Sequence, residues 1–182
     1  MAALKGAVIF IWDILKIVLI SLVIIVPIRA FIVQPFTVWG DSMTPTFDSG
    51  DYLFINEIGY RLSAPERGDV IIFKPPHDDK RFFIKRIVGL PGETLKIEGG
   101  KVWAGQDDES LELLSENYVS AETVGSIDIS LGEDEYFVLG DNRRASSDSR
   151  AWGVLDRDRI IGKAWIRAWP FNKFEVIKRP EY

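Results

Sequence analysis

A long apolar run near the N-terminus constrains the fold more than any other feature. Residues 7–33 are mostly apolar, and Ile17–Ile28 contains no charged side chain. A helix needs about 20 apolar residues to cross the hydrocarbon core of a bilayer, which is roughly 30 Å thick. The run therefore predicts one N-terminal transmembrane α-helix, within a membrane anchor over residues 1–33.

Two other interpretations of the run are less favoured. A cleaved secretory signal has a short apolar region followed by small residues, whereas Ile28–Phe31 has the sequence Ile-Arg-Ala-Phe. A buried core helix of a soluble protein is seldom so uniformly apolar. Lys5 and Lys16 precede the uncharged segment and only Arg29 follows it within the run. This slight excess predicts a cytoplasmic N-terminus and an extracytoplasmic domain behind one membrane span.

The composition of the whole chain excludes several classes of function. Hydrophobic residues make up 47% of its 182 residues, which is ample for a packed core. A net charge of −5 argues against a nucleic-acid-binding protein. The absence of cysteine excludes disulfides and thiolate metal sites, and the single histidine excludes a site with several histidines. No metal, organic cofactor or oligomer is predicted. That histidine, His77, lies in a proline-rich loop beside Asp78 and is interpreted as a surface residue.

Short apolar segments separated by turns predict a mainly β domain after the anchor. Strands are expected over Pro35–Val38, Tyr52–Asn56, Val70–Phe73, Arg81–Val88, Thr94–Glu98, Lys101–Trp103, Tyr136–Leu139, Arg159–Trp169 and Phe174–Ile177. Gly99 and Gly100 predict a tight hairpin between two of them. Residues 106–135 are rich in acidic side chains and lack Lys and Arg, as in a solvated insertion. We therefore expect a β core over 34–98 and 136–182, and an acidic insertion or small β subdomain over 99–135.

Three segments carry side chains capable of hydrolytic chemistry. Ser42 lies among small and turn-forming residues in Gly40–Thr46, where a hydroxyl can be exposed. Lys85 shares a strand face with apolar neighbours. Burial there would lower the pKa of its ammonium group, and a neutral amine is a competent general base. A polar loop over Gly140–Arg150 follows another strand. Together these segments suggest a serine-lysine hydrolase.

Four segments, in this order, resemble those of the bacterial type I signal peptidases. These enzymes are membrane-anchored Ser-Lys endopeptidases that remove signal peptides from exported proteins. The segments are Gly40–Thr46 (Gly-Asp-Ser-Met-Thr-Pro-Thr), Arg67–Phe73, Lys85–Glu93 and Gly140–Gly153. With the apolar N-terminus, the resemblance covers nearly all of the chain except the acidic insertion. It implies a β catalytic domain like that of signal peptidases and self-cleaving repressor proteases, held at the cytoplasmic membrane.

The resemblance also implies roles for individual residues. Ser42 would be the nucleophile, Lys85 the general base, and the Ser42 backbone N–H an oxyanion donor. Some members of the family have a serine two residues before the nucleophile, which supplies a second donor. This chain has Gly40 there, as Gram-positive-type members do, and leaves open whether that donor is a backbone amide or water.

Four residues of the last segment have implied supporting roles. Ser146 matches a serine that hydrogen-bonds to the lysine and orients it. Asp148 and Arg150 match a supporting salt bridge, and Asp141 matches a structural carboxylate.

The resemblance places an extended substrate peptide between Pro35–Trp39 and Phe82–Lys85. Two shallow apolar pockets would accept small side chains, in agreement with the Ala-x-Ala pattern before signal cleavage sites. The pocket residues would be Phe36, Val38, Met43, Phe83 and Ile84. An apolar rim is expected to dip into the outer leaflet of the bilayer. The rim residues would be Phe31, Phe36, Trp39 and Phe47. The expected partners are signal peptides of exported preproteins and the lipid bilayer.

Three alternative interpretations explain these residues less well. A self-cleaving repressor carries a DNA-binding domain and no anchor, so the run over 7–33 argues against it. A signal peptidase of the Ser-His type needs histidine at the position of Lys85. A membrane-tethered, non-catalytic β-domain that binds partners would explain the anchor and the strands. It would not explain why Ser42, Lys85, Ser146 and Asp148 all match family positions.

Overall fold

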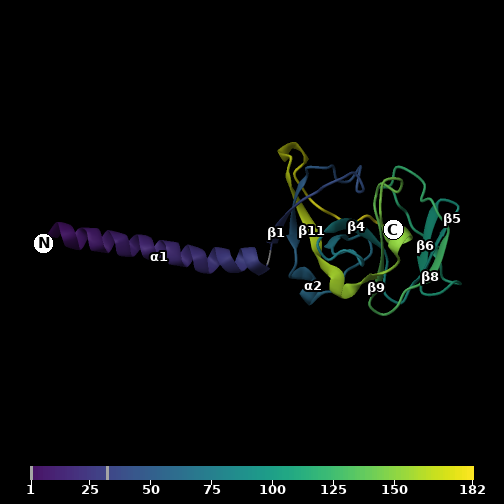
Figure 1. The fold of residues 1–182 in the computed structure, drawn as a ribbon, viewed down its shortest axis with the longest axis horizontal. Helices are drawn as coiled ribbons and strands as arrows, with labels where there is room; N and C mark the ends of the chain where they lie inside the picture. The colour runs from purple at the N-terminus through teal and green to yellow at the C-terminus, as the bar shows by residue number, and fades with distance from the viewer. Residues whose placement is uncertain (1, 32) are drawn as a thin grey trace.

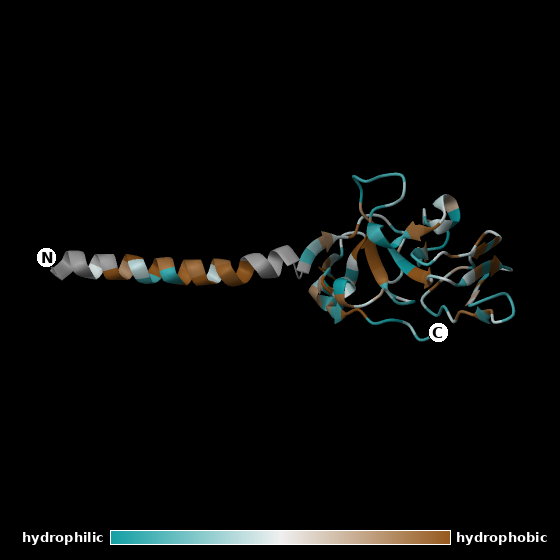
Figure 2. Cartoon of the chain, turned by 90° about the horizontal axis from the view of Figure 1, so that it is seen from below, coloured by the Kyte–Doolittle hydropathy of each residue, from teal (hydrophilic) through white to brown (hydrophobic). Residues whose placement is uncertain are grey.

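The structure is a computed structural model, which describes residues 2–31 and 33–182, and side chains for residue 6, 9–25 and 34–182. Helix α1 (Ala2–Phe31) projects away from a β-rich domain (Figure 1). Its described side chains from Ile9 to Ile25 are exposed and mostly apolar (Figure 2). Among them, Lys16 Nζ lies 3.2 Å from Asp13 Oδ1. Within the described residues, no helix has the length and hydropathy of a membrane span.

The larger sheet confirms the mainly β fold and has eight strands, with every neighbouring pair antiparallel. Along the sheet its strands are β1 (Val33–Thr37), β2 (Tyr52–Asn56), β11 (Ile160–Trp169), β3 (Val70–Phe73), β4 (Phe83–Gly89), β9 (Glu135–Leu139) and β10 (Leu155–Asp156), and β12 (Glu175–Val176) pairs with β11. Strand β1 lies at one end of the sheet. Among the described residues it pairs with β2 alone, which leaves its other edge free there. Strand β11, from late in the chain, separates β2 from β3.

A second, four-stranded sheet contains the predicted two-glycine hairpin. Its order is β7 (Glu112–Leu113), β6 (Lys101–Gly105), β5 (Thr94–Glu98) and β8 (Ile127–Ser130). This sheet therefore begins at Thr94, before the expected boundary at residue 99. The acidic segment is also more structured than a solvated insertion. It supplies β7 and β8 and buries Leu114 and Leu131, because its spaced apolar residues pack on the hairpin.

Short helical turns connect the strands. They are α2 (Gly59–Leu62), α3 (Ser149–Trp152), η1 (Arg157–Arg159) and η2 (Phe171–Lys173). The carboxylate of Asp148 caps α3 by accepting from the backbone N–H of Arg150. Buried side chains form three clusters, of which one lies between the two sheets and two belong to the larger sheet. The predicted strands at β2 and β3 match the structure residue for residue, whereas β4 begins two residues later, because Arg81 and Phe82 are exposed.

Candidate active site

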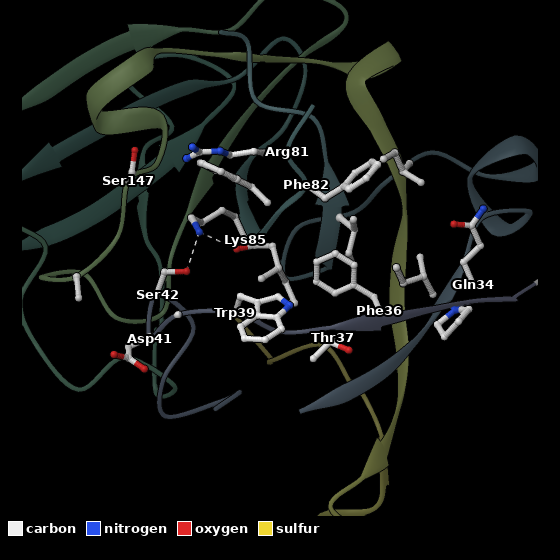
Figure 3. Close-up of a pocket in the computed structure, with 18 residues that line it drawn as sticks. Gln34, Phe36, Thr37, Trp39, Asp41, Ser42, Arg81, Phe82, Lys85 and Ser147 are labelled. Atoms are coloured by element: carbon white, nitrogen blue, oxygen red, sulfur yellow. Dashed lines mark hydrogen bonds between the residues drawn. The ribbon is translucent and has the colours of Figure 1, made fainter. Parts of the chain in front are cut away.

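Ser42 lies in the turn that follows β1. Two fully buried side chains, Met43 and Phe47, anchor this turn in the core, and the Phe47 N–H donates to Met43 O at 2.9 Å. Gly40 has a positive φ of 85°, which L side chains rarely adopt, and so lets the chain turn just before the serine. Ser42 itself remains half-buried and lines a cleft (Figure 3). The local sequence therefore buries its apolar residues and leaves the hydroxyl accessible.

Lys85 projects from β4 toward Ser42. Its Nζ donates to Ser42 Oγ and to Ile84 O, both at 2.8 Å, as Figure 3 shows for the serine. The lysine is only 4% exposed, and its Nζ also lies 5.4 Å from the centroid of the Phe83 ring. Burial lowers the pKa of Lys85 to about 8, against the opposing charges of Asp148 and Asp141. A useful fraction of the amine is therefore neutral near neutral pH.

The loop after β9 holds the serine turn by backbone hydrogen bonds. The Asn142 N–H donates to Ser42 O at 3.0 Å, and Asn142 Nδ2 donates to Asp41 O at 3.0 Å. Gly140 lies directly against both segments. A Cβ there would come within 2.5 Å of Ser42 O and closer still to Ser146 Oγ. Only glycine allows this approach, so the loop and the serine turn depend on each other for position.

Two carboxylates of this loop, Asp141 and Asp148, form buried ion pairs. Arg86 donates to Asp141 through Nε at 2.9 Å and Nη2 at 2.7 Å, and both side chains are almost fully buried. Asp141 Oδ2 also accepts from Thr46 Oγ1 at 2.5 Å, which joins the end of the serine turn to β4. Arg150 makes two hydrogen bonds of 2.8 Å to Asp148. Both carboxylates that the resemblance singles out are therefore buried and paired with an arginine.

Asp148 stays ionised in spite of its burial. Burial alone would raise the pKa of its carboxyl, but the hydrogen bonds from Arg150, the nearby hydroxyl of Ser146 and the Gly140 N–H, at 3.1 Å, outweigh it and lower that pKa. The resemblance implies a hydrogen bond from Ser146 to Lys85. Instead, the buried Ser146 Oγ lies near the Asp148 carboxylate, and its geometry satisfies no hydrogen bond with the described residues, Lys85 included. Lys85 instead bonds to Ser42 and Ile84.

The dyad forms one part of the wall of a cleft of about 730 Å³ between β1 and the start of β4. Three of the five expected pocket residues, Phe36, Phe83 and Ile84, line it. The cleft is further lined by Gln34, Pro35, Thr37, Trp39, Gly40, Asp41, Ser42, Ile55, Ile72, Arg81, Phe82, Lys85, Ala145, Ser147 and Ile161. Val38 and Met43 do not line it and are buried in the core. The resemblance implies pocket positions for both, whereas in this turn their side chains pack in the core.

Other predicted residues are placed as follows. Phe47 is fully buried in the core and cannot belong to an exposed rim. Trp39 is 82% exposed and lines the cleft. His77 is exposed in the loop between β3 and β4 and does not line the cleft. The side chain of Phe31 lies outside the described residues. In the part of the chain that the structure describes, no group of three or more His, Cys, Asp or Glu side chains converges as metal ligands would.

Sequence reasoning missed the residues that connect the site to the rest of the fold. Arg86 and Asn142 are polar residues inside the resemblance segments, so a search for buried partners of Asp141 and Ser42 would have pointed to them. Glu116 carried no such signal. It pairs with Arg143 of the polar loop, although the composition of its segment predicts a solvated insertion. This pair joins the insertion to the loop that holds Ser42.

Comparisons with known proteins identify the family of this chain. Residues 11–169 match the family model described as "Signal peptidase, peptidase S26". The probable signal peptidase I-2 of Synechocystis sp. is 36% identical over 168 residues, which cover 89% of this chain and 75% of that protein. Signal peptidase I of Leptolyngbya laminosa is 35% identical over 91% of this chain and 83% of its own length. Signal peptidase IB of Staphylococcus aureus is 32% identical over 89% and 91%, respectively.

A solved signal peptidase I from Enterococcus faecalis is 28% identical, with a TM-score of 0.48, covering 56% of this chain and 97% of that one. The family assignment depends on the family model and on the sequence relatives. The chain belongs to the signal peptidase family, peptidase S26, the serine endopeptidases that process signal peptides.

Proposed function

We propose that Ser42 and Lys85 carry out the cleavage of exported preproteins after an Ala-x-Ala site, at the membrane surface. The observation that carries this proposal is the 2.8 Å hydrogen bond between Lys85 Nζ and Ser42 Oγ in the wall of an open, largely apolar cleft. A nucleophile and a base within hydrogen-bond reach are the minimal equipment for acyl transfer. The chain offers no histidine at the cleft to act instead.

The reaction proceeds in two acyl transfers. Neutral Lys85 accepts the hydroxyl proton as Ser42 Oγ attacks the scissile carbonyl. The resulting tetrahedral intermediate collapses to an ester, and the lysine ammonium gives its proton to the departing amine. Neutral Lys85 then takes a proton from water, which attacks the ester and releases the signal peptide with a free carboxylate. Ser42 Oγ recovers its proton from Lys85, so the enzyme returns to its initial state.

The oxyanion of each intermediate is stabilised by the backbone N–H of Ser42. Gly40 has no hydroxyl, and its own N–H donates to Ser49 Oγ at 3.2 Å. Gly40 therefore supplies no second donor through either group in this geometry. One preorganised donor is typically worth 10²–10³ in rate, so a site with a single protein donor remains catalytically useful.

The substrate peptide binds in extended form along the free edge of β1. An edge strand presents unpaired N–H and C=O groups, and an added strand satisfies them. Phe36, Phe83 and Ile84 lie along the same cleft and provide apolar contacts at alternate substrate positions. Large side chains on the cleft wall leave shallow pockets, which favour alanine over bulkier residues in the substrate.

We assign α1 as the anchor that holds this cleft at the cytoplasmic membrane, in a single pass with the N-terminus inside. The helix has 30 residues and is about 45 Å long at 1.5 Å per residue. Its described apolar side chains from Ile9 to Ile25 are exposed, so no other described residue covers them. Trp39, on the rim of the cleft, is suited to the interfacial region of the bilayer. Trp39→Asp should weaken vesicle binding of an anchor-free domain, and unchanged binding would remove Trp39 from the proposal.

The test of the reaction is cleavage of a precursor with one Ala-x-Ala site in detergent micelles. Intact protein is compared with Ser42→Ala, Lys85→Ala and the control Lys80→Ala, which removes an exposed lysine five residues before Lys85. We expect the intact protein to cleave after the second alanine. The cleavage rate should fall by about 10³-fold or more in either dyad variant, and it should not fall in the Lys80→Ala control. Activity that survives in folded Lys85→Ala would place the base elsewhere. Binding without cleavage by intact protein would favour a non-catalytic β module.

A further inference from the structure

The last five residues, 178–182, cross back over the turn that precedes β3. Pro180 and Tyr182 pack on Gly68 so closely that a Cβ there would lie 2.9 Å from Pro180 Cδ and 3.0 Å from Tyr182 Cε2. Arg179 donates from Nε to Asp69 Oδ1 at 2.5 Å and also pairs with Glu66. The segment, hereafter the closing segment, is therefore attached both by packing and by charge.

Tyr182 of the closing segment meets Tyr118 of the acidic insertion. Their hydroxyl oxygens are 3.0 Å apart, and their rings pack edge to face with centroids separated by 6.4 Å. Tyr118 OH also donates to Glu116 Oε1 at 2.9 Å. Desolvation of the hydroxyl groups raises the pKa of both phenols above the ordinary tyrosine value, although Tyr182 as a whole is 41% exposed. Both hydroxyls therefore stay protonated in the working pH range. Two distant parts of the chain thus form one aromatic pair.

This pair covers the buried ion pair behind the dyad. The guanidinium carbon of Arg86 lies 4.2 Å from the centroid of the Tyr118 ring. Nη1 of Arg86 donates at 2.9 Å to the carbonyl of Gly68, the same glycine on which Tyr182 packs. Nε and Nη2 of the guanidinium donate to Asp141. Each nitrogen of the guanidinium therefore donates to a protein partner, and Arg86 is only 3% exposed.

Arg86 and Asp141 are both immediate neighbours of groups that touch the reaction. Arg86 follows Lys85 on β4. Asp141 accepts from Thr46 in the serine turn, and the next residue, Asn142, donates to Ser42 O. A shift of the Arg86–Asp141 pair would therefore move the serine turn relative to β4. Exclusion of water strengthens this pair, because a charge interaction weakens as the local dielectric constant rises.

We propose that Tyr182, acting through Tyr118, is a positioning residue for the Ser42–Lys85 reaction. The two rings keep water from the Arg86–Asp141 pair, and that pair holds the serine turn against β4. The inference rests on the proposed function of the dyad. It gives the closing segment a role in the reaction and not merely in stability.

The test compares the intact protein with Tyr182→Ala and Tyr182→Leu by kcat/KM and its pH profile. We expect kcat/KM to fall about tenfold in Tyr182→Ala, mainly through kcat, because a small misplacement of reacting groups is costly. The pH midpoint should also move upward, since a loosened Arg86 compensates Asp141 less and favours the protonated form of Lys85. Tyr182→Leu retains part of the cover, so its kcat/KM and pH midpoint should lie between those of the intact protein and Tyr182→Ala. Leu113→Ala is the control, because Leu113 is 44% exposed and Tyr182 41%, and it should match the intact protein.

A double-mutant cycle separates positioning from general destabilisation. If Tyr182 acts through Tyr118, then Tyr182→Ala should cost little further in a Tyr118→Ala background. Thermal unfolding of each variant fixes an assay temperature at which all are folded. An unchanged kcat/KM and pH midpoint in Tyr182→Ala or Tyr182→Leu, with an active parent, would overturn this inference alone. An inactive parent would overturn the proposed function and this inference with it.

Discussion

The protonation of Lys85 gives the sharpest quantitative prediction. With a pKa of about 8, the amine is about 9% neutral at pH 7, about 50% at pH 8 and about 91% at pH 9. An ordinary lysine with a pKa of 10.5 would be only about 0.03% neutral at pH 7. Burial behind Ser42 therefore increases the reactive fraction at pH 7 by about 300-fold. The cause is the 4% exposure of Lys85, which makes its charged form costly.

The assay is kcat/KM for a soluble peptide with one Ala-x-Ala site and no titratable group nearby, measured from pH 6 to 10. This parameter reports the ionisation of the free enzyme. We expect a rise of about tenfold between pH 7 and pH 9, followed by a plateau. Asp148, Tyr118 and Tyr182 should not interfere. The pKa of Asp148 lies below its ordinary value and those of the two tyrosines lie above theirs.

Two results would refute the reasoning. A rise of about 100-fold from pH 7 to pH 9 without a plateau would indicate a lysine with an ordinary pKa. A profile that levels off below pH 7 would indicate a base of the histidine class, for which His77 would have to move from its exposed loop.

Three further changes test the surroundings of the dyad. Lys85→Met should stabilise the fold by about 2 kcal/mol at pH 7, because burying the ammonium costs about 3 kcal/mol and the lost bond to Ile84 returns part of that. This difference in stability between Lys85→Met and the intact protein should shrink by about 1 kcal/mol toward pH 9. Above about pH 8 the folded intact protein loses the Lys85 proton while its unfolded chain keeps it, so the intact protein gains stability as pH rises. Urea unfolding at pH 7 and pH 9 measures the two unfolding free energies, and a difference that stays constant would contradict this prediction. Gly140→Ala should cost about 1–3 kcal/mol and most of the activity, because its Cβ would overlap Ser42 O. Gly132→Ala is the control. Its Cβ would meet the flexible Glu135 side chain at 3.2 Å, so it should lower neither stability nor activity. Arg86→Met should cost about 3–5 kcal/mol by leaving the Asp141 charge buried and unpaired, and a loss below 1 kcal/mol in thermal unfolding would show that water reaches the pair.

The sequence was informative where side-chain chemistry and strand alternation agree. A lysine in an apolar strand has few roles, and a serine in a turn after an edge strand has room to react. The pairing of Asp148 with Arg150 followed from the resemblance and is present. The resemblance also placed Phe83 and Ile84 in the substrate pockets, and both line the cleft. Only the apolar strand around Lys85 followed from local residue types.

Where the backbone is irregular, the sequence did not indicate which side chains face the core. Val38, Met43 and Phe47 lie in or beside the serine turn, where neither a period of two nor of 3.6 applies, and all three face the core. Ser146 was assigned by family position, but its hydroxyl depends on loop details that a motif does not contain. The contact of Tyr118 with Tyr182 joins segments 64 residues apart and has no local signature.

The position of β11 has a consequence for when the protein can act. Strands β1 and β2 lead into and out of the turn with Ser42, and β4, paired with β3, carries Lys85, but β11 lies between these two pairs. The two halves of the dyad are thus aligned only after residues 160–169 have entered the sheet. Such a non-local pairing forms late and slowly. A chain that emerges from its N-terminus therefore has no aligned Ser42–Lys85 pair until residues 160–169 have emerged.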